Sequence, residues 1–444
     1  MRKIKSMLWW LLLGLTGLWL WVDTITTTPL AFMAMRNSLI NYTGVLGIGM
    51  MSVGMVLAVR PVWFEPYLGG LDKMYRLHKW LGMGGGILSV THWLVVQAPR
   101  WLFALELLTP SSGGRPPRQE QTVAVFKLFQ SLRGLAEGLG EWAFYATLVL
   151  IALALIKWFP YRLFFKTHRL LAATYLILVF HSVVLMNYTY WSSMLGAVMA
   201  ALMAAGSVSA VMVLFRKVGE RRKVGGVIER VEHFAELKVL YVFIKLEGRW
   251  AGHAAGQFAF VTFDSDEGAH PFTITSAWLD DGRITFLIKG LGDYTNQLPA
   301  YLKLGSAVEV EGPYGQFTFD STKPRQIWVG AGIGITPFVA RMKSLAQTPD
   351  DKPVDLFHCT AVLDPSAIEK MQADADGARV NLHVTVDDRD GRLDAQRICA
   401  AVPQWLDADI WFCGPPAFGH ALKQDFVARG LAASHFHQEL FEMR

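Results

Sequence analysis

Long apolar runs in the first half of the sequence constrain this chain more than any other feature. Six of them are long enough to cross a bilayer as helices. They lie near residues 7–22, 40–59, 79–97, 141–159, 169–186 and 191–215. Because the bilayer core holds no water, every backbone N–H and C=O of a spanning segment needs an internal partner, which a helix provides. The sequence therefore predicts a six-span helical transmembrane domain over residues 1–221.

Basic residues predict the orientation of these spans. A positive excess occurs at the N-terminus and at Arg60–Arg76, Lys157–Arg169 and Arg216–Lys223, all on one side of a six-span arrangement. The positive-inside rule assigns that side to the cytoplasm. Basic residues beside apolar segments suit the anionic headgroups of a lipid bilayer better than nucleic acid. We therefore expect a multi-pass protein of the inner or cell membrane, with a cytoplasmic N-terminus, no nucleic-acid partner and no obligatory protein partner.

The segments outside the spans fit this interpretation. The first apolar run follows a basic N-terminus but precedes no small-residue cleavage site, so we interpret it as a retained membrane helix. Segment 98–140 should face the outside. It contains LLTPSSGGRPPRQEQ (107–121), whose Pro, Gly and Ser content predicts flexibility.

Four of the twelve histidines fall within apolar spans. Intramembrane ionisable residues are costly and are candidates for function. His78 and His92 are 14 residues apart, about 40° short of four helical turns, so they share a face about 21 Å apart along the helix. His168 and His181 are 13 apart and about 140° out of line on a straight helix. Only a kink, an irregular turn or an irregular helix start would align the second pair.

The depths of the four histidines match in pairs. His78 and His168 lie near the cytoplasmic ends of their spans, and His92 and His181 lie further out. Two pairs at two depths suit two stacked b-type haems, each held by two axial imidazoles. The alternatives are polar contacts between helices and a zinc site, which would gather its ligands at one point.

The second half has the patterns of a soluble protein. Short β-rich segments from GVIERVEHF (226–234) to RITFLIKGL (283–291) predict a small antiparallel β-barrel over residues 222–322. QIWVGAGIGITPFVARMKSL (326–345) then places a Gly-rich turn between a strand and a helix. Later strands alternate with helical segments, which predicts an α/β nucleotide-binding domain over 323–444. The three cysteines suggest neither a disulfide framework nor a metal cluster.

Four motifs carry a family resemblance. HPFTITS (270–276) resembles the flavin-binding signature of the ferredoxin–NADP reductase superfamily, whose membrane branch comprises NADPH oxidases and ferric reductases. GPYG (312–315), GAGIGITP (330–337) and CGPP (413–416) follow in that family's order. The transmembrane histidine spacings of 14 and 13 match it too. The resemblance covers nearly the whole chain from the second span onward.

The resemblance implies the cofactor-binding residues. For FAD they are His270, Pro271, Phe272, Thr273, Thr275, Ser276, Gly290, Thr295 and Phe441. For NAD(P)H they are Gly312, Pro313, Gly330, Gly332, Gly334, Thr336, Pro337, Arg392, Cys413, Gly414 and Pro415.

Three of these assignments have a structural alternative. Cys413 should lie by the nicotinamide and take part in catalysis, or it is a buried small residue. Phe441 should stack on the flavin, or it is an ordinary core phenylalanine. Arg392, with Arg389 nearby, should hold a 2′-phosphate, or both belong to a solvated charged turn. NADPH is the nucleotide that the resemblance implies, with NADH as the alternative.

The expected function is transmembrane electron transfer. Electrons from cytoplasmic NADPH would pass through FAD and two haems to an acceptor outside. The acceptor is either oxygen, giving superoxide, or a ferric chelate, and we favour the oxidase. A third interpretation is a flavin reductase merely held at the membrane, with the histidines as contacts between helices.

Overall fold

A computed structural model describes residues 2–23, 32–107, 122–156 and 158–439. The chain divides into two compact units, which are described separately. Helices up to Val218 form the first, and the second begins at Gly219. The predicted flexible stretch 107–121 falls outside the described residues, apart from its first residue.

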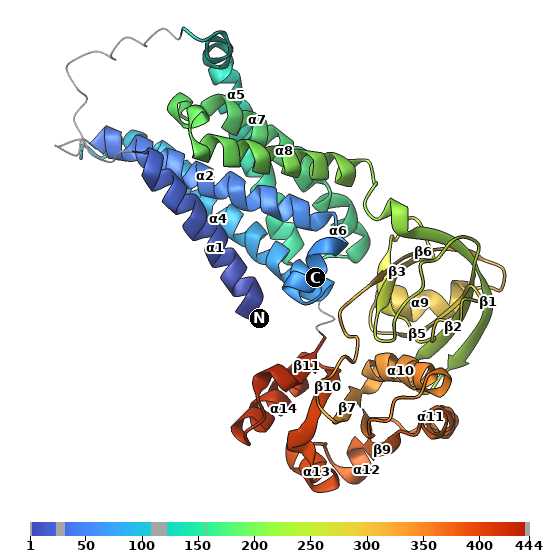
Figure 1. The fold of residues 1–444 in the computed structure, drawn as a ribbon. Helices are drawn as coiled ribbons and strands as arrows, with labels where there is room; N and C mark the ends of the chain where they lie inside the picture. Colours follow the sequence, from blue (N-terminus) through green and yellow to red (C-terminus); the bar gives the residue numbers. More distant parts are fainter. Residues whose placement is uncertain (1, 24–31, 108–121, 157, 440–444) are drawn as a thin grey trace. The chain divides into compact units, whose positions relative to one another are not determined.

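The first unit is entirely helical (Figure 1). Its long helices are α1 (Arg2–Val22), α2 (Phe32–Ala58), α4 (Leu71–Ala104), α5 (Ala124–Leu155), α6 (Tyr161–His168), α7 (Leu170–Leu185) and α8 (Met194–Leu214). The short elements are η1 (Val62–Phe64), α3 (Glu65–Leu68) and η2 (Tyr188–Ser192). Helix α5 packs along α7, and α2 packs along α8.

Five helical segments are long and apolar enough to cross a membrane. They are Lys3–Val22, Phe32–Ala58, Ala124–Leu155, Tyr161–Leu185 and Met194–Leu214. The predicted span 79–97 lies within the 34-residue α4, but its four glycines, Thr91 and His92 lower its mean hydropathy. The protein thus has a helical membrane unit with five spans evident from composition, and a crossing by α4 stays a prediction.

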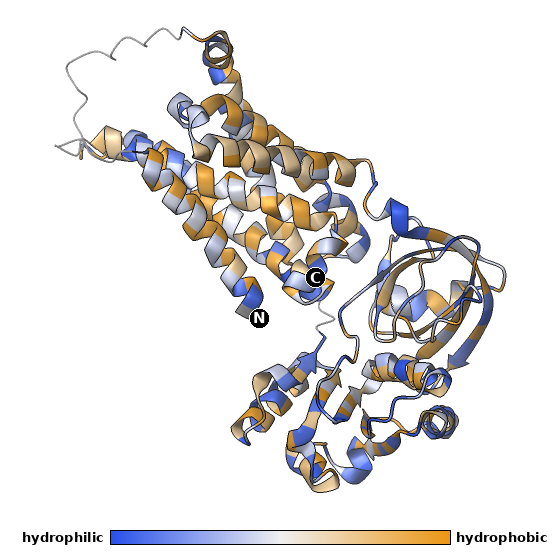
Figure 2. Ribbon diagram, viewed as in Figure 1, coloured by the Kyte–Doolittle hydropathy of each residue, from blue (hydrophilic) through white to orange (hydrophobic). Residues whose placement is uncertain are grey.

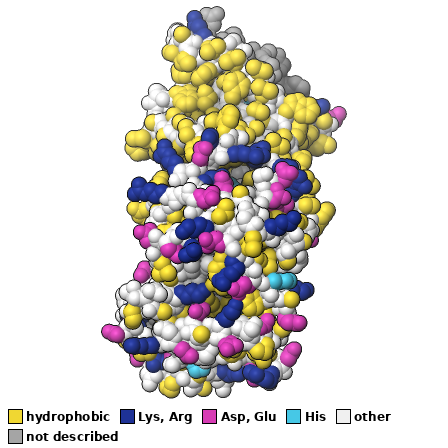
Figure 3. Space-filling model, turned by 90° about the vertical axis from the view of Figure 1, so that its right-hand side faces the viewer, with side chains coloured by type: hydrophobic (Ala, Val, Ile, Leu, Met, Phe, Trp, Pro, Cys, Tyr) yellow, Lys and Arg dark blue, Asp and Glu magenta, His cyan; other side chains and the backbone are white. Residues whose placement is uncertain are grey.

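The surface of this unit supports a lipid environment. Large apolar side chains such as Trp10, Trp21 and Trp142 are at least 74% exposed. Figure 2 colours many residues of these helices as hydrophobic, and in the space-filling view of Figure 3 hydrophobic side chains cover most of the upper part of the view. Three of the buried residues of α5 are small (Ala136, Gly140 and Ala143), which lets this part of α5 approach α7 closely.

The second unit starts with a six-stranded antiparallel sheet, ordered β4-β3-β6-β1-β2-β5. Its strands are β1 (Lys223–Phe234), β2 (Val239–Leu246), β3 (Phe258–Thr262), β4 (His270–Thr273), β5 (Arg283–Lys289) and β6 (Ala307–Tyr314). A single bridge, Ile274 to Phe286, links the ends of this order. Closure into a full barrel stays a prediction. Helix α9 (Asp293–Tyr301) connects β5 to β6.

A five-stranded parallel sheet follows, with the order β11-β10-β7-β8-β9. Its strands are β7 (Arg325–Ala331), β8 (Val354–Thr360), β9 (Asn381–Val386), β10 (Ala408–Cys413) and β11 (Phe436–Gln438). The connecting helical elements are η4 (Gly332–Ile335), α10 (Thr336–Gln347), α11 (Pro365–Ala378), α12 (Asp387–Asp390), α13 (Ala395–Ala401), η5 (Trp405–Asp407), α14 (Pro416–Ala428) and η6 (Ala433–His435).

Helices cover both faces of this sheet. Phe338 on α10 and Met371 on α11 pack on one face with Trp328. Ile398 on α13 and Phe426 on α14 pack on the other face. The predicted α/β architecture is confirmed, and it is doubly wound about β7.

Candidate functional site

The four membrane histidines form two pairs. His78 on α4 lies opposite His168 at the end of α6, with ring centroids 5.9 Å apart. His92 on α4 lies opposite His181 on α7, at 6.3 Å. The structure therefore groups them as the sequence predicts, one histidine from each side at each of two depths.

An irregular turn resolves the 13-residue spacing. Helix α6 ends at His168 and α7 begins at Leu170. The turn at Arg169 carries a tighter bond, from Ala172 N to Arg169 O at 3.1 Å. Arg169 itself keeps helical angles (φ −63°, ψ −28°), and His168 before this turn lies against His78 while His181 lies against His92.

The separations fit one metal ion between the rings of each pair. A metal–imidazole bond is about 2.0–2.1 Å, and the ring centroid lies about 1.1 Å behind the nitrogen. Two imidazoles on opposite sides of one ion therefore have centroids about 6.3 Å apart. The outer pair has this separation at 6.3 Å, and the inner pair at 5.9 Å is about 0.4 Å closer.

Hydrogen bonds at Nδ1 orient three of the four imidazoles. His78 Nδ1 lies 2.9 Å from Gly54 O, His92 Nδ1 lies 3.1 Å from Ile40 O, and His181 Nδ1 lies 2.8 Å from Ala136 O. A carbonyl accepts only from N–H, so in each case Nε2 keeps the lone pair for a metal. His168 Nδ1 is buried and has no hydrogen-bond partner among the described residues. The four residues fit two bis-histidine haems, and His168 is the least supported of them.

Glycines make room for the outer pair. A Cβ at Gly140 would overlap the His181 ring, whose atoms are its three nearest neighbours. A Cβ at Gly44 would lie 3.6 Å from Cε1 of His92. Arg36 on α2 adds a fixed positive charge nearby, because its guanidinium donates to Val95 O (3.0 Å) and Val96 O (2.7 Å) just beyond His92.

The HPFT motif forms strand β4 at one end of the antiparallel sheet. His270, Pro271, Phe272 and Thr273 pair with β3. The His270 ring stacks on Tyr294 of α9, at 4.5 Å and 18°. Burial lowers the pKa of His270 to about 4, so its imidazole is neutral. The Tyr294 hydroxyl is buried without a hydrogen-bond partner among the described residues, and a bound FAD would supply one.

Thr275 and Ser276 use their hydroxyls within the protein. Thr275 Oγ1 accepts from Leu287 N at 3.1 Å, and Ser276 Oγ accepts from Thr285 N at 3.2 Å. They tie the end of the flavin signature to β5. His253, which sequence reasoning missed, supports this segment by donating from Nε2 to Ser276 O at 3.0 Å.

Gly290 and Thr295 shape the start of α9. Thr295 Oγ1 accepts from Leu291 N at 2.9 Å and Gly292 N at 3.2 Å, so it caps this helix N-terminus. A Cβ at Gly290 would overlap Asn296 Oδ1. Both residues have a structural role, and contact with the FAD pyrophosphate stays a prediction.

The Gly-rich turn and the CGPP motif meet at the carboxyl edge of the parallel sheet. Gly330 of β7 pairs with Cys413 of β10, and the chain order reverses between these two strands. Ligands of doubly wound sheets bind in this crevice. A Cβ at Gly334 would overlap Cys413 O, so only glycine lets η4 pack here. Thr336 and Pro337 open α10, and Gly414 and Pro415 precede α14.

Gly312 and Pro313 do not belong to the parallel sheet that carries the Gly-rich turn. Both are on β6 of the antiparallel sheet, where Arg222 Nη1 donates to Pro313 O at 2.8 Å. The loop after β6 still approaches the C-terminal strand, since a Cβ at Gly315 would lie 3.5 Å from Glu439 Oε1.

Sequence reasoning missed Glu439, whose charge acts on Cys413. Both are buried, and burial followed by the Glu439 charge raises the pKa of Cys413. Glu439 follows β11 directly, and its only sequence signal is an acidic residue two positions before Phe441. Phe441 itself lies outside the described residues.

Arg389 and Arg392 differ in availability. Arg389 binds Asp390 through two contacts of 2.8 Å, whereas the Arg392 guanidinium is exposed and contacts no described residue. Both follow β9 at the carboxyl edge of the sheet. Of the two, Arg392 has its charge available for a phosphate.

Comparisons with known families agree with this arrangement. Residues 43–179 match the family "Ferric reductase like transmembrane component", and residues 233–318 match "FAD-binding domain". In this chain a segment that matches a ferric-reductase-like transmembrane component thus precedes a segment that matches an FAD-binding domain. The first match contains His78, His92 and His168 and ends at Val179, two residues before His181.

Similar proteins match parts of the chain. A "Flavohemoprotein" from Oceanobacillus iheyensis is 24% identical over 34% of this chain and 40% of its own length. An "NADPH oxidoreductase" from Mycobacterium tuberculosis is 28% identical over 36% and 43%. "Ferric reduction oxidase 5" from Arabidopsis thaliana is 30% identical over 27% and 20%. The chain thus spans about half the length, 40–58%, of the first three curated relatives it matches.

A solved structure of a flavohemoglobin from Malassezia yamatoensis aligns with 91% of this chain and 98% of its own. The identity is 16% and the TM-score 0.49. A "Ferredoxin reductase in carbazole 1,9a-dioxygenase" aligns with 49% and 69%, at 20% identity and a TM-score of 0.43.

Proposed function

We propose that this chain is a transmembrane oxidoreductase. It takes electrons from NADPH on the cytoplasmic side and delivers them to oxygen outside, producing superoxide. The observation that carries the proposal is the pair of histidine pairs, each at metal-bridging separation, in a chain that continues into an FAD-binding domain. When bound, FAD takes a hydride from NADPH and releases single electrons, which the two haems can carry across the membrane.

The residues have distinct tasks in this scheme. The carboxyl edge of the parallel sheet, with Gly330 and Cys413, binds the nicotinamide nucleotide. His270 and Tyr294 form an apolar, stacked wall for the flavin. His78 with His168, and His92 with His181, hold the inner and outer haems. This requires α4 to cross the membrane as a sixth span, with both termini in the cytoplasm.

Coordination chemistry bears on how an acceptor would be reduced. Two histidines on each haem iron would leave it no open position, so an acceptor would not need to bind the metal. Oxygen is small and apolar and needs no polar pocket to reach the outer pair through the membrane unit. This favours the oxidase.

A ferric chelate reductase is the second candidate. It is favoured by the names of the matching transmembrane family and of the Arabidopsis relative. It uses the same electron path, and Arg36 supplies a positive charge that would attract an anionic chelate to the outer pair.

One experiment separates the candidates. The full chain in liposomes, loaded with FAD and haem, is given NADPH with either oxygen or a ferric chelate as sole acceptor. The oxidase predicts cytochrome c reduction that superoxide dismutase abolishes. Anaerobic ferric reduction without any superoxide signal in air would assign the reductase. A reduced-minus-oxidised spectrum without a b-haem signal would refute both.

A further inference from the structure

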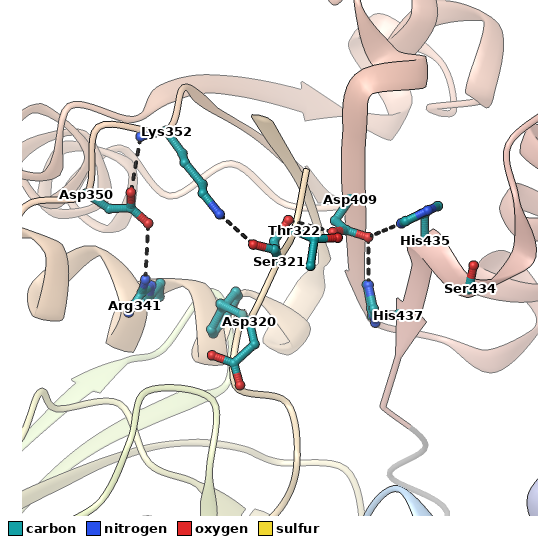
Figure 4. Close-up of a pocket in the computed structure, with 11 residues that line it drawn as sticks. Asp320, Ser321, Thr322, Arg341, Asp350, Lys352, Asp409, Ser434, His435 and His437 are labelled. Atoms are coloured by element: carbon teal, nitrogen blue, oxygen red, sulfur yellow. Dashed lines mark hydrogen bonds and ion pairs between the residues drawn. The ribbon is translucent and has the colours of Figure 1, made fainter. Parts of the chain in front are cut away.

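A pocket of about 530 Å³ opens at the amino edge of the parallel sheet (Figure 4). It lies at the start of β10, whereas the predicted nucleotide site lies at the ends of β7 and β10. At its centre is the Asp409 cluster, defined here as Asp409, Ser321, His435 and His437. No residue of this cluster belongs to the sites described above.

Asp409 is a buried carboxylate, only 2% exposed, with three side-chain donors. Ser321 Oγ donates to Oδ2 at 2.5 Å. His435 Nδ1 and His437 Nε2 both donate to Oδ1 at 2.9 Å. Burial alone would raise the pKa of Asp409, but these hydrogen bonds hold it below its usual value. The carboxylate is therefore charged, and both histidines are fixed as donors.

The cluster joins three separate parts of the second unit. Asp409 is on β10, Ser321 is on the linker between the two sheets, and the histidines flank the start of β11 (Figure 4). The His437 ring also stacks on Trp411 of β10, at 4.1 Å and 15°. Strand β11 has only three residues and lies at the sheet edge, so its own ladder holds it weakly.

Strand register connects this cluster to the far edge of the sheet. Trp411 pairs with His437, and Phe412 pairs with Gln438. Because side chains alternate along a strand, Asp409, Trp411 and Cys413 share one face of β10. His435, His437 and Glu439 share the same face of the C-terminal segment. One residue beyond the pair Phe412–Gln438, the same register puts Glu439 opposite Cys413.

We propose that Asp409, through His435 and His437, sets the register of the C-terminal strand and thereby places Glu439 beside Cys413. A slip by one residue would turn every side chain of β11 to the opposite face and remove Glu439 from Cys413. The three residues are positioning residues. The placement of Glu439 does not depend on the proposed function, and only its consequence for NADPH oxidation does.

Several charged side chains surround the cluster. Lys352 Nζ donates to Ser321 O at 2.5 Å, Lys423 Nζ to Phe436 O at 3.4 Å, and Lys323 Nζ to Leu406 O at 3.1 Å. Arg341 and Asp350 lie 3.9 Å apart, and Asp320 accepts from Thr318.

Burial lowers the pKa of His437, and the Asp409 hydrogen bond opposes this only in part. A released His437 therefore binds a proton more readily than a docked one. The docked strand should weaken as the pH falls below about 6.5, the usual pKa of histidine.

Alkylation of Cys413 by iodoacetamide tests the inference without any turnover. The full FAD-loaded chain is labelled in detergent micelles, and Cys413, Cys359 and Cys399 are quantified separately by mass spectrometry. Asp409→Ala should speed Cys413 labelling roughly tenfold, because the two hydrogen bonds to the C-terminal strand region, from His435 and His437, are lost. Buried Cys359 reports global unfolding, and half-buried Cys399 is the internal reference.

The chain offers a matched control. Asp355 is a similarly buried carboxylate on β8, bonded to Arg325 at 2.9 Å and to His383 at 3.3 Å. Asp355→Ala should leave Cys413 labelling, relative to Cys359, unchanged. Equal acceleration in Asp355→Ala and Asp409→Ala would overturn the proposal, because it would show general destabilisation.

Conservative variants separate register from packing. His435→Asn and His437→Gln keep an N–H donor near the original Nδ1 and Nε2 and cannot be protonated. Together they should keep Cys413 protected and abolish the increase in its labelling, relative to Cys399, between pH 7.5 and 5.5. If Cys413 in this Asn/Gln variant is labelled as fast as in the double variant His435→Ala and His437→Ala, the hydrogen bonds to Asp409 do not hold the strand.

A stopped-flow measurement adds the consequence for function. Flavin reduction by NADPH without oxygen should slow in Asp409→Ala and recover in the Asn/Gln variant, with nucleotide KM little changed. If the parent flavin is not reduced at all, the proposed function fails while the labelling result stands. If Cys413 in Asp409→Ala is labelled faster while NADPH reduces the flavin at the parent rate, the position of Glu439 has no role in hydride transfer.

Discussion

Replacing Gly140 on α5 by alanine adds a single methyl group beside His181 and so tests the haem assignment. A Cβ there would lie 2.6 Å from Cε1 and 2.7 Å from Cγ of His181. Carbon atoms at optimal separation are about 3.5–4.0 Å apart. In Gly140→Ala either the imidazole or the helix must therefore move by about 1 Å. Metal–ligand distances in genuine sites vary by only about 0.2 Å, so the outer pair should lose its geometry.

The size of the effect follows from two contributions. Overpacking costs about 1–3 kcal/mol when a well-packed site gains a methyl group. The shift also disturbs the bond from His181 Nδ1 to Ala136 O, one turn earlier on the same helix. Losing such an outer partner lowers metal affinity about 10–100-fold. We expect Gly140→Ala to keep the inner haem, with haem per protein falling from two towards one.

Gly138→Ala is the matched control. Gly138 is exposed on the same helix, and a Cβ there would meet no atom within 4 Å. Alanine should even favour the helix by up to about 1 kcal/mol. The pyridine haemochrome assay counts the haems, and a redox titration with optical detection shows which one is lost. Two haems with identical midpoint potentials in both variants would refute the arrangement of His92 and His181.

Three further predictions follow from the same structure. His92→Leu should remove the outer haem and stop acceptor reduction while NADPH still reduces the flavin; two haems with unchanged spectra would contradict the ligand assignment. Arg392→Ala should raise the KM for NADPH roughly ten- to a hundredfold more than the KM for NADH, since a charge-assisted hydrogen bond contributes about 1.5–3 kcal/mol. Arg389→Ala is the comparison, and equal effects of Arg392→Ala on the two KM values would exclude a 2′-phosphate contact. Phe441→Ser, measured at saturating FAD, should tighten nucleotide binding up to about tenfold, because stacking worth about 0.5–1.5 kcal/mol no longer competes with the nicotinamide; affinity and hydride-transfer rate equal to the parent's would make Phe441 a packing residue.

Periodicity predicted the features that depend on one helix or one strand at a time. The 14-residue spacing of His78 and His92 places both on one face of α4, as observed. The 13-residue spacing required a break, and α6 does end at His168. The alternation of apolar strands and helices after Gln326 predicted the parallel sheet, whose strands β7, β8 and β10 are buried on both faces.

Helix ends at the membrane surface were predicted less well. Segment 98–140 was expected to be an outer loop, yet α4 continues to Ala104 and α5 begins at Ala124. An apolar run marks only the part of a helix that the bilayer covers, and a helix can continue into water on polar residues such as Arg133 and Glu137. These two form an (i, i+4) ion pair at 2.9 Å on α5, which supports the helix there.

Apart from the two histidine pairs, hydrogen-bonded partnerships between distant residues were not predicted. Asp409, His435 and His437 have ordinary spacings, and only the pairing of β10 with β11 brings them together. Glu439 is likewise unremarkable in the sequence until the register places it opposite Cys413. The hydrogen bonds from His78, His92 and His181 reach backbone carbonyls, which every residue possesses and no sequence pattern marks.

The two histidine pairs differ in a way that bears on how electrons would move between them. Both imidazoles of the outer pair donate to carbonyls, whereas in the inner pair only His78 does, and His168 Nδ1 has no partner among the described residues. A hydrogen bond at Nδ1 makes an imidazole a stronger electron donor, and second-shell hydrogen bonding is one of the means by which a protein sets a haem potential. Stronger donors stabilise the ferric form and lower the reduction potential. On this contrast alone the outer site should have the lower potential, so the step outward would run against the potential difference and depend on rapid removal of the electron by the acceptor.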